Sequence, residues 1–208
     1  MRTEPQEKSA IAFFDGQNLF YASKEAFGYT YPNFDPLKLA SKICQSKGWN
    51  LIETHFYTGI PDPIDNPSWN HFWTAKLAVM GTRGIKCFSR RLRYRNRTIT
   101  MHDGSTCTAP VGVEKGIDVR IALDVLRLGF EKAYDVALIF SQDQDLSEVA
   151  QEIRTISLQQ DRWIKVASAY PLGPASQNRK GINFTDCIPI LRQDYDACLD
   201  TNDYRPKK

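Results

Sequence analysis

Short apolar runs that alternate with stretches of helical periodicity are the feature that most constrains the fold of this chain. The runs that read as buried strands lie at residues 10–14, 51–57, 85–88, 136–140 and 163–170. Helical patterns occupy residues 36–47, 68–80, 116–128 and 146–156. Continuously apolar strands separated by helices are typical of a parallel sheet covered on both faces. The sequence therefore predicts an α/β fold.

Length and composition agree with one globular unit. The chain has 208 residues, of which 42% are hydrophobic, enough for a single α/β domain with a real core. We expect a disordered polar leader at residues 1–9, one domain at residues 10–198 and a polar tail at residues 199–208. The first residues lack the apolar segment of a signal peptide, and no apolar run approaches the ~20 residues of a membrane span.

Cysteine usage and net charge set weaker limits. The five cysteines are odd in number and form no C-x-x-C pair, which is typical of reduced thiols in a cytoplasmic protein. Lys and Arg number 27 against 24 Asp and Glu, a formal net charge of +3. That balance says little about partners, so the distribution of charge along the chain has to be considered.

Acidic residues stand after two of the predicted strands and at the opening of one helix. Asp15 ends the first strand in FFDGQN, Asp143 and Asp145 follow the fourth in FSQDQDL, and Asp118 lies in EKGIDVRIALD. In an open α/β sheet the carboxyl ends of the strands line the ligand crevice. If the first and fourth strands are neighbours, these four carboxylates converge on one edge of the sheet.

Converging carboxylates favour a cation site. Two of them ~4 Å apart repel by on the order of 4 kcal/mol at an effective dielectric constant of ~20. Oxygen ligands suit Mg²⁺ or Mn²⁺, and such an ion can stabilise the charge of a phosphoryl transition state. Each aspartate taken alone is equally a turn or cap residue, and Asp145 is a plausible N-cap of its helix. The coincidence of three such places favours the cation site.

The three segments resemble the motifs of the NYN domain family, a branch of the PIN-like ribonuclease superfamily. Those motifs are a strand ending in D-x-x-N, a K-G-x-D helix opening and an S-G-D-S-D-F stretch, and the resemblance runs from about residue 11 to about residue 191. It implies a PIN-like, Rossmann-like parallel sheet of order 3-2-1-4-5 and metal-dependent cleavage of RNA with Mg²⁺ or Mn²⁺. By motif position, the catalytic and metal-site roles fall on Asp15, Asp118, Asp143 and Asp145.

Three further residues are candidates for supporting roles. Asn18 either orders Asp15 or a metal-bound water, or caps a helix that starts at the next residue. Lys115 either meets the scissile phosphate or is a solvated helix end. Ser141 is expected to end the fourth strand and to bond one of the acids.

Two departures of the third motif from the family pattern bear on packing and catalysis. Gln142 stands where the family has glycine, and Leu146 where it has phenylalanine. We expect Leu146 to keep the packing. We expect Gln142 to narrow the approach of a phosphate backbone and so to weaken catalysis.

A basic stretch follows the third strand. Between residues 83 and 97 there are seven basic residues and no acidic one. The alternating pattern RLRYRNRTITM predicts a β-ribbon insertion, with a turn at Asp103-Gly104. Arginine side chains on a ribbon can bind phosphates, and a tyrosine can stack on a base. The predicted RNA contacts are Arg90, Arg91, Arg93, Tyr94, Arg95 and Arg97. The alternative is a solvated edge whose charges prevent aggregation.

These patterns favour a metal-dependent ribonuclease with RNA as its partner and no membrane association. One alternative is a catalytically weak nucleic-acid-binding or regulatory protein that keeps the PIN-like fold, which Gln142 favours. A phosphatase of the haloacid dehalogenase type also starts from a strand-end aspartate. It needs a second acid two residues later, where this chain has Gln17. The sequence leaves open the RNA substrate, endonuclease or exonuclease action, and the oligomeric state.

Overall fold

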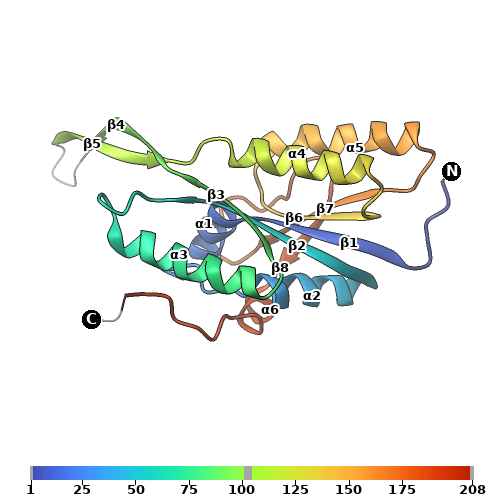
Figure 1. The fold of residues 1–208 in the computed structure, drawn as a ribbon, viewed down its shortest axis with the longest axis horizontal. Helices are drawn as coiled ribbons and strands as arrows, with labels where there is room; N and C mark the ends of the chain where they lie inside the picture. The colour runs from blue at the N-terminus through green and yellow to red at the C-terminus, as the bar shows by residue number, and fades with distance from the viewer. Residues whose placement is uncertain (1, 101–104, 207–208) are drawn as a thin grey trace.

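A parallel sheet forms the centre of the molecule in the computed structural model, which describes residues 2–100 and 105–206 (Figure 1). Across this described part, the strand order is β3 (Lys86–Arg91), β2 (Trp49–Ile60), β1 (Lys8–Asp15), β6 (Val136–Phe140), β7 (Lys165–Pro171) and β8 (Asp186–Ile190). The predicted strands and the 3-2-1-4-5 order are confirmed. The added edge strand β8 was not predicted, because Ile188 and Ile190 alternate with exposed residues in a run of only five.

The predicted basic ribbon is confirmed as a separate two-stranded antiparallel sheet. It consists of β4 (Arg93–Thr100) and β5 (Thr106–Val113), paired from Arg93 with Val113 to Thr100 with Thr106. In Figure 1 the ribbon extends beyond the main sheet at the end where β1 finishes. The expected Asp103-Gly104 turn lies outside the described residues.

Helices cover both faces of the sheet. One face carries α1 (Gly16–Phe27), α2 (Pro36–Lys47), α3 (Pro67–Thr82) and α6 (Arg192–Asp196), and the other carries α4 (Ile117–Phe130) and α5 (Ser147–Gln159) (Figure 1). Side chains of β1 alternate between the two cores: Ala12 and Phe14 pack with the first set of helices, and Ile11 and Phe13 with the second. Burial on both faces explains why this strand reads as a continuous apolar run.

Two helix ends illustrate how far local signals reach. α2 begins and ends as predicted, because the Asp35 carboxylate accepts hydrogen bonds from the first turn and Gly48 adopts a left-handed conformation with φ of +67°. α4, whose pattern was expected to stop at residue 128, continues past Gly129 to Phe130. A Cβ on Gly129 would lie 2.7 Å from Ile153 of α5. This glycine therefore serves close packing of α4 on α5 and does not cap the helix.

The amino-terminal boundary differs from the expected one. β1 begins at Lys8, within the segment expected to be a leader. The backbone and hydroxyl of Ser9 both donate to the Asp135 carboxylate, at 2.9 and 2.7 Å. These hydrogen bonds hold the start of β1 beside the start of β6.

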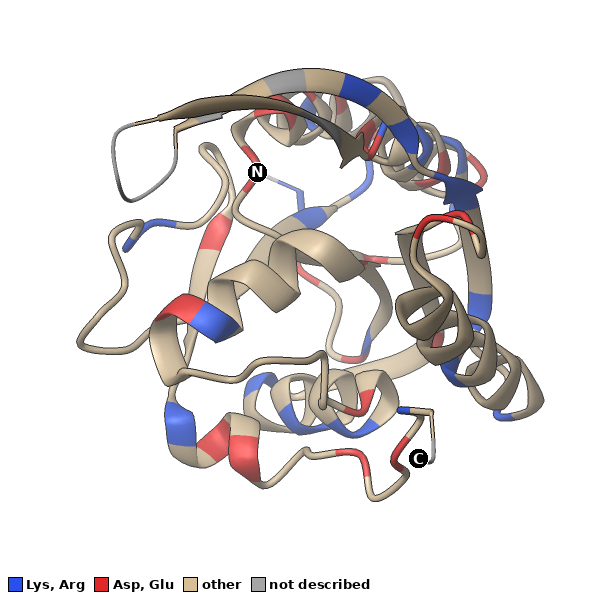
Figure 2. Cartoon of the chain, turned by 90° about the vertical axis from the view of Figure 1, so that its left-hand side faces the viewer, with Lys and Arg blue, Asp and Glu red and all other residues tan. Residues whose placement is uncertain are grey.

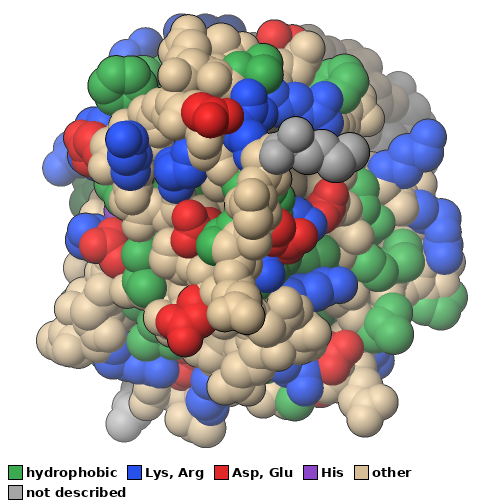
Figure 3. All heavy atoms as spheres, turned by 90° about the vertical axis from the view of Figure 1, so that its right-hand side faces the viewer, with side chains coloured by type: hydrophobic (Ala, Val, Ile, Leu, Met, Phe, Trp, Pro, Cys, Tyr) green, Lys and Arg blue, Asp and Glu red, His purple; other side chains and the backbone are tan. Residues whose placement is uncertain are grey.

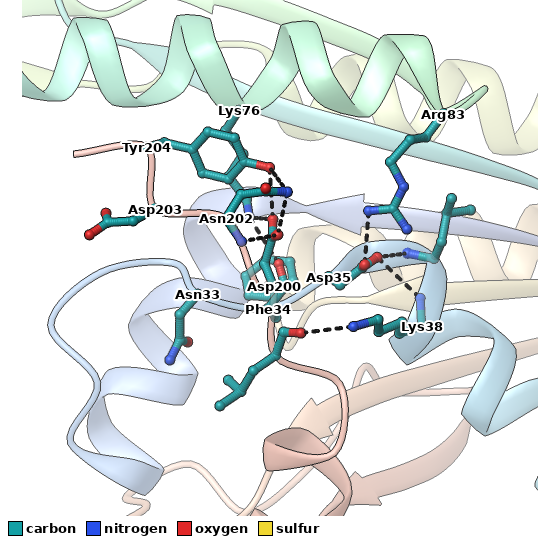
Figure 4. A network of polar contacts seen from close by, with 12 residues as sticks. Asn33, Phe34, Asp35, Lys38, Lys76, Arg83, Asp200, Asn202, Asp203 and Tyr204 are labelled. Atoms are coloured by element: carbon teal, nitrogen blue, oxygen red, sulfur yellow. Dashed lines mark hydrogen bonds and ion pairs between the residues drawn. The ribbon is translucent and has the colours of Figure 1, made fainter. Parts of the chain in front are cut away.

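The carboxyl-terminal segment, expected to be a polar tail, contributes to the interior (Figure 4). Lys76 of α3 is fully buried and donates to the Asp200 carboxylate at 2.9 Å and to the Phe34 carbonyl at 3.0 Å. The Tyr204 hydroxyl donates to the same carboxylate at 3.0 Å, and its ring centroid lies 5.0 Å from the Lys76 ammonium. Burial lowers the pKa of Lys76, and the negative charge of Asp200 opposes that shift.

The end of the molecule where β1 starts shows no charge pattern comparable to the ribbon. Figure 3 views this end, where basic and acidic side chains are interspersed over the surface.

Of the helices in the described ranges, none is both long enough and apolar enough to cross a lipid bilayer.

We expect Asp200→Ala to lower the free energy of unfolding by about 3–5 kcal/mol, because it leaves the buried Lys76 ammonium without its counter-charge. Urea denaturation followed by circular dichroism measures the change. Asp203→Ala is the matched control, since Asp203 pairs with Arg205 at the exposed surface. Equal denaturation midpoints for the two variants would show that the buried ion pair does not anchor this segment.

Candidate active site

The carboxyl edge of the sheet, which faces the viewer in Figure 2, contains an acidic cavity of about 300 Å³. It is lined by Asp15, Glu114, Lys115, Gly116, Ile117, Asp118 and Asp143. The lining comes from three places in the fold: the end of β1, the junction between β5 and α4, and the segment after β6. Three of the four predicted carboxylates therefore meet here, together with one that was not predicted.

Asp15 is the most buried of these acids, with 6% of its surface exposed. Its Oδ1 accepts a hydrogen bond from the Asn18 backbone at 3.0 Å and so caps α1. The helix can start directly after Asp15 because residue 16 is glycine. A Cβ there would lie 2.9 Å from the Tyr57 carbonyl and 2.7 Å from the Phe56 ring, which is too close. Glycine is thus required where α1 passes β2. The aspartate that caps the helix is also the one that lines the cavity.

Ser141 and Asn18 tie the end of β1 to the segment after β6. The Ser141 hydroxyl donates to Asp15 Oδ2 at 3.4 Å and accepts from the Asp143 backbone at 3.1 Å. The Asn18 side chain accepts from the Gln142 backbone at 2.8 Å. The expected bond between Ser141 and an acid is confirmed. The alternative in which Asn18 caps a helix is wrong, because α1 starts at Gly16 with Asp15 as its cap.

Asp145 lies apart from the other predicted acids. It is exposed, it does not line the cavity, and its backbone nitrogen donates to Asp143 Oδ1 at 3.0 Å. This bond closes the short 3-10 turn η1 (Gln144–Leu146) that precedes α5. Asp143 therefore supplies the cap that the sequence suggested for Asp145.

Glu114 is the carboxylate that sequence reasoning missed. It is partly buried, and its Oε1 has no hydrogen-bond partner among the described residues. Burial raises the pKa of Glu114 to about 8, the charges of Asp15 and Asp118 add to the shift, and a hydrogen bond from the Gly59 backbone opposes it. The one available signal was its position directly before the K-G-x-D motif.

The cavity is electrostatically unfavourable when its acids are ionised. Burial raises the pKa of Asp15 to about 6, and the charges of Asp143 and Asp118 raise it further against the hydrogen bonds from Asn18 and Ser141. Raised pKa values in neighbouring carboxyl groups mean that the site favours a bound proton or a bound cation.

The donor chemistry suits a hydrated divalent ion. Within the described ranges, no group of three or more His, Cys, Asp or Glu side chains is close enough to surround one metal ion. Mg²⁺, however, usually keeps several waters and binds through one or two carboxylates and substrate phosphates. The four cavity carboxylates offer oxygen donors only, and Glu114 Oε1 is a buried acceptor without a partner. These residues fit such an ion.

A buried polar network fixes α4, which carries Asp118, against β2. Asp124 is 5% exposed and accepts hydrogen bonds from the Tyr57 hydroxyl at 3.0 Å and from Arg120 Nε at 2.9 Å. Six positions rotate a helix by roughly 600°, so Asp118 and Asp124 lie on different faces. The interior face of α4 thus holds the helix while Asp118 faces the cavity.

One arginine of the basic stretch reaches the rim of the cavity. A Cβ on Gly116 would lie 2.6 Å from Nη1 of Arg90, so the guanidinium group rests against this glycine. Gly116 has φ of +74° and itself lines the cavity. Positive charge is therefore present directly beside the cluster of carboxylates.

The other predicted RNA contacts lie along the ribbon and its root (Figure 2). Arg93 and Arg95 are exposed in β4, and Arg97 follows in the same strand opposite Ala109. At the start of the ribbon, Asp62 contacts two of the predicted residues. Its carboxylate lies 3.8 Å from Arg91, and its backbone nitrogen donates to the Tyr94 hydroxyl at 3.2 Å.

Leu146 and Gln142, which depart from the family motif, lie in different surroundings. Leu146 is 1% exposed and packs in the core beneath α4 and α5, so the packing is kept as predicted. Gln142 is not part of the cavity lining, and its side chain donates to the carbonyls of Asn178 and Lys180. The expectation that Gln142 narrows the approach of a phosphate backbone stays a prediction.

Comparison with known proteins identifies relatives of this chain. The family model of the NYN domain matches residues 9–160. Low amplitude and bright protein LabA of Synechococcus elongatus is 23% identical over 145 residues, which are 68% of this chain and 66% of that protein. A solved structure of a protein of unknown function from Vibrio parahaemolyticus is similar with a TM-score of 0.54 and 17% identity, covering 93% of this chain and 98% of that one. This structural likeness supports the fold alone.

The raised pKa values predict how stability depends on pH without divalent ions. Asp15 and Glu114 bind protons more tightly in the folded state, with pKa values of about 6 and about 8, than at their ordinary values of 3.8 and 4.5. Stability from these groups is therefore fully present below about pH 4 and is lost as the pH rises through about 8. In chelator, we expect Glu114→Gln to flatten the fall of the melting temperature over this range.

The matched control is Glu152→Gln, which removes an exposed carboxylate from α5. It should reproduce the pH profile of the wild type in the same thermal unfolding experiment. Parallel profiles for the wild type and Glu114→Gln would show that Glu114 ionises as freely as an exposed glutamate.

Proposed function

Because the chain belongs to the NYN domain family, a nuclease-like family, we propose that it is a metal-dependent ribonuclease that hydrolyses RNA phosphodiester bonds. One observation carries the proposal. Asp15, Asp118 and Asp143 come from three separate motifs of the sequence and line one cavity at the carboxyl edge of the sheet.

Asp15, Asp118 and Asp143 would hold Mg²⁺ or Mn²⁺, with Glu114 as the fourth cavity carboxylate in place of Asp145. An ion bound there supplies charge that orients a water molecule and stabilises the phosphoryl transition state. Hydrogen bonds from Asn18 and Ser141 hold the Asp15 carboxylate in one orientation.

Substrate binding falls to the cations around the cavity, because the carboxylates repel a polyanion. Lys115 is exposed at the cavity and would contact the scissile phosphate. Arg90 at the rim and Arg93 and Arg95 on β4 would bind the sugar-phosphate backbone, with the ring of Tyr94 available for stacking on a base. We expect the protein to act in the cytoplasm, as its cysteine usage indicates.

A nucleic-acid-binding protein with weak or no catalysis is the second candidate. It is favoured by the spacing of the carboxylates, since no three of the described acids are close enough to surround one ion. This candidate uses the same basic ribbon and predicts RNA binding without cleavage.

The substitution Asp118→Asn separates the two candidates. It removes a charge from the cavity and leaves every phosphate-binding cation in place, so we expect RNA cleavage to fall by roughly 100-fold or more while RNA affinity stays within about twofold. Labelled single-stranded RNA with Mg²⁺, Mn²⁺ or chelator provides the measurement, and thermal shift records ion binding.

Stabilisation by Mg²⁺ or Mn²⁺ should also disappear in Asp15→Asn, and Glu152→Gln serves as the control with a lost exposed carboxylate. Wild-type protein that binds RNA but does not cleave it with either ion would support the second candidate. Cleavage by Asp118→Asn at the wild-type rate would exclude Asp118 from the reaction.

For the ribbon, we expect the double variant Arg93→Ala/Arg95→Ala to bind RNA more weakly and with a smaller salt dependence. Each lost phosphate contact lowers the slope of log affinity against log salt by roughly 0.7 on a single strand. Lys47→Ala/Lys132→Ala is the matched control, because it removes two exposed charges away from the ribbon. A salt slope equal to that of the control would mean that the ribbon is only a solvated edge.

A further inference from the structure

We propose that residues 178–183, which connect β7 to β8, form a phosphate-binding rim for RNA that Gln142 and Gln144 hold beside the acidic cavity, with Lys180 as the contacting cation. The inference rests on the proposed function and extends it to a second wall of the site. It is carried by the hydrogen bonds of two glutamines that stand in the motif after β6.

Gln142 binds the backbone of this segment from a buried position. Its side chain is 8% exposed, and its amide group donates to the carbonyl of Lys180 at 2.8 Å and to that of Asn178 at 3.2 Å. Its backbone nitrogen donates to the Asn18 side chain at 2.8 Å. Gln142 thus links the segment to the first turn of α1, where the Asn18 backbone also orients Asp15.

Gln144, two residues later, also binds the backbone of this segment. Its amide nitrogen donates to the carbonyl of Gly181 at 3.0 Å, and its amide oxygen accepts from the backbone of Asn183 at 3.1 Å. The family motif has glycine and serine at these two positions, and neither side chain is long enough to make such contacts. The two glutamines therefore add contacts to this segment that the family residues cannot make.

The remaining contacts leave the segment little freedom. A Cβ on Gly181 would lie 2.1 Å from the Ser168 hydroxyl, and that hydroxyl accepts from the Ile182 backbone at 3.0 Å. On the amino-terminal side, the Gln177 backbone donates to the Glu25 carboxylate of α1. The backbone of residues 178–183 is thus held from β7, from α1 and from the loop after β6.

Two exposed cations project from this fixed backbone. Arg179 donates to the carbonyl of Gly173 at 3.3 Å. Lys180 is exposed, and its ammonium group has no ion pair or hydrogen bond within the described part of the chain. An ordered backbone that carries an uncompensated ammonium group is suited to a phosphate.

The topology places this cation across the cavity from the ribbon. The ribbon follows β3, the segment lies between β7 and β8, and the cavity lies where β1 and β6 end, between those two edges of the sheet. A single strand that crosses the acidic cavity would meet the ribbon arginines on one side and Lys180 on the other. The rim would therefore add a phosphate contact that the ribbon cannot supply.

The test combines amide hydrogen exchange with binding of a fluorescein-labelled single-stranded RNA in chelator, where no cleavage occurs. The variants are Lys180→Ala, the double variant Gln142→Ala/Gln144→Ala, and their combination. Both alanines keep their backbone N–H groups, so the hydrogen bond to Asn18 remains possible. Lys47→Ala is the control for loss of an exposed lysine at the opposite end of the sheet.

We expect Lys180→Ala to weaken RNA binding about three- to fivefold and to lower the salt slope by roughly 0.7, with Lys47→Ala unchanged. The double glutamine variant should weaken binding to a similar degree and speed exchange in residues 178–183. In the double glutamine variant, the further substitution Lys180→Ala should reduce RNA affinity less than it does in the wild type, because the glutamines act by positioning this lysine.

Unchanged hydrogen exchange of residues 178–183 in the double glutamine variant would show that Gln142 and Gln144 do not order this segment. RNA binding that Lys180→Ala leaves at the wild-type level would overturn the phosphate contact alone, as would strictly additive effects of the lysine and the glutamines. Wild-type protein that neither binds nor cleaves RNA would overturn the proposed function, and the ligand of the rim with it.

Discussion

A carboxylate buried at the end of the central strand is the constraint on which the rest of the structure depends. β1 pairs with β2 on one side and β6 on the other, and each of its faces meets a core, so Asp15 at its end is largely buried and lines the cavity. Its two oxygens accept hydrogen bonds from the start of α1 and from Ser141 after β6. One side chain therefore sets where a helix begins, how two strands end and where the cavity forms.

The distribution of charge follows from that placement. Burial, together with the charges of neighbouring carboxylates, raises the pKa values of Asp15 and Glu114, and those charges also repel any polyanion. A net charge of +3 does not by itself overcome this repulsion. The cations are instead concentrated at the rim and on the ribbon, close to the cavity but outside it. If the proposed function holds, attraction of RNA and binding of a cation would fall to separate surfaces that share one edge of the sheet.

Most of the fold could be predicted from the sequence because the strands are continuously buried, while their order required the family resemblance. What could not be predicted depends on contacts that are distant along the chain. Gln142 and Gln144 meet their partners 36–39 residues later, so their role has no local signature. Glu114 differs from other glutamates mainly by its burial and then by the charge of the neighbouring Asp15, which lies far from it in sequence. β8 was missed because an edge strand buries only alternate residues.

Capping and site formation are usually weighed as alternatives for an aspartate after a strand, yet here they coincide. Asp15 and Asp143 each use Oδ1 to accept a backbone hydrogen bond from the turn that follows, and both line the cavity. A capping bond fixes the plane of the carboxylate and occupies one oxygen, which leaves the second oxygen oriented for another partner. Asp145 is exposed, and its carboxylate accepts no backbone hydrogen bond from the part of the chain that the structure describes. In this chain the capping bond therefore distinguishes the motif aspartates that end a strand and form the site from the one that does not.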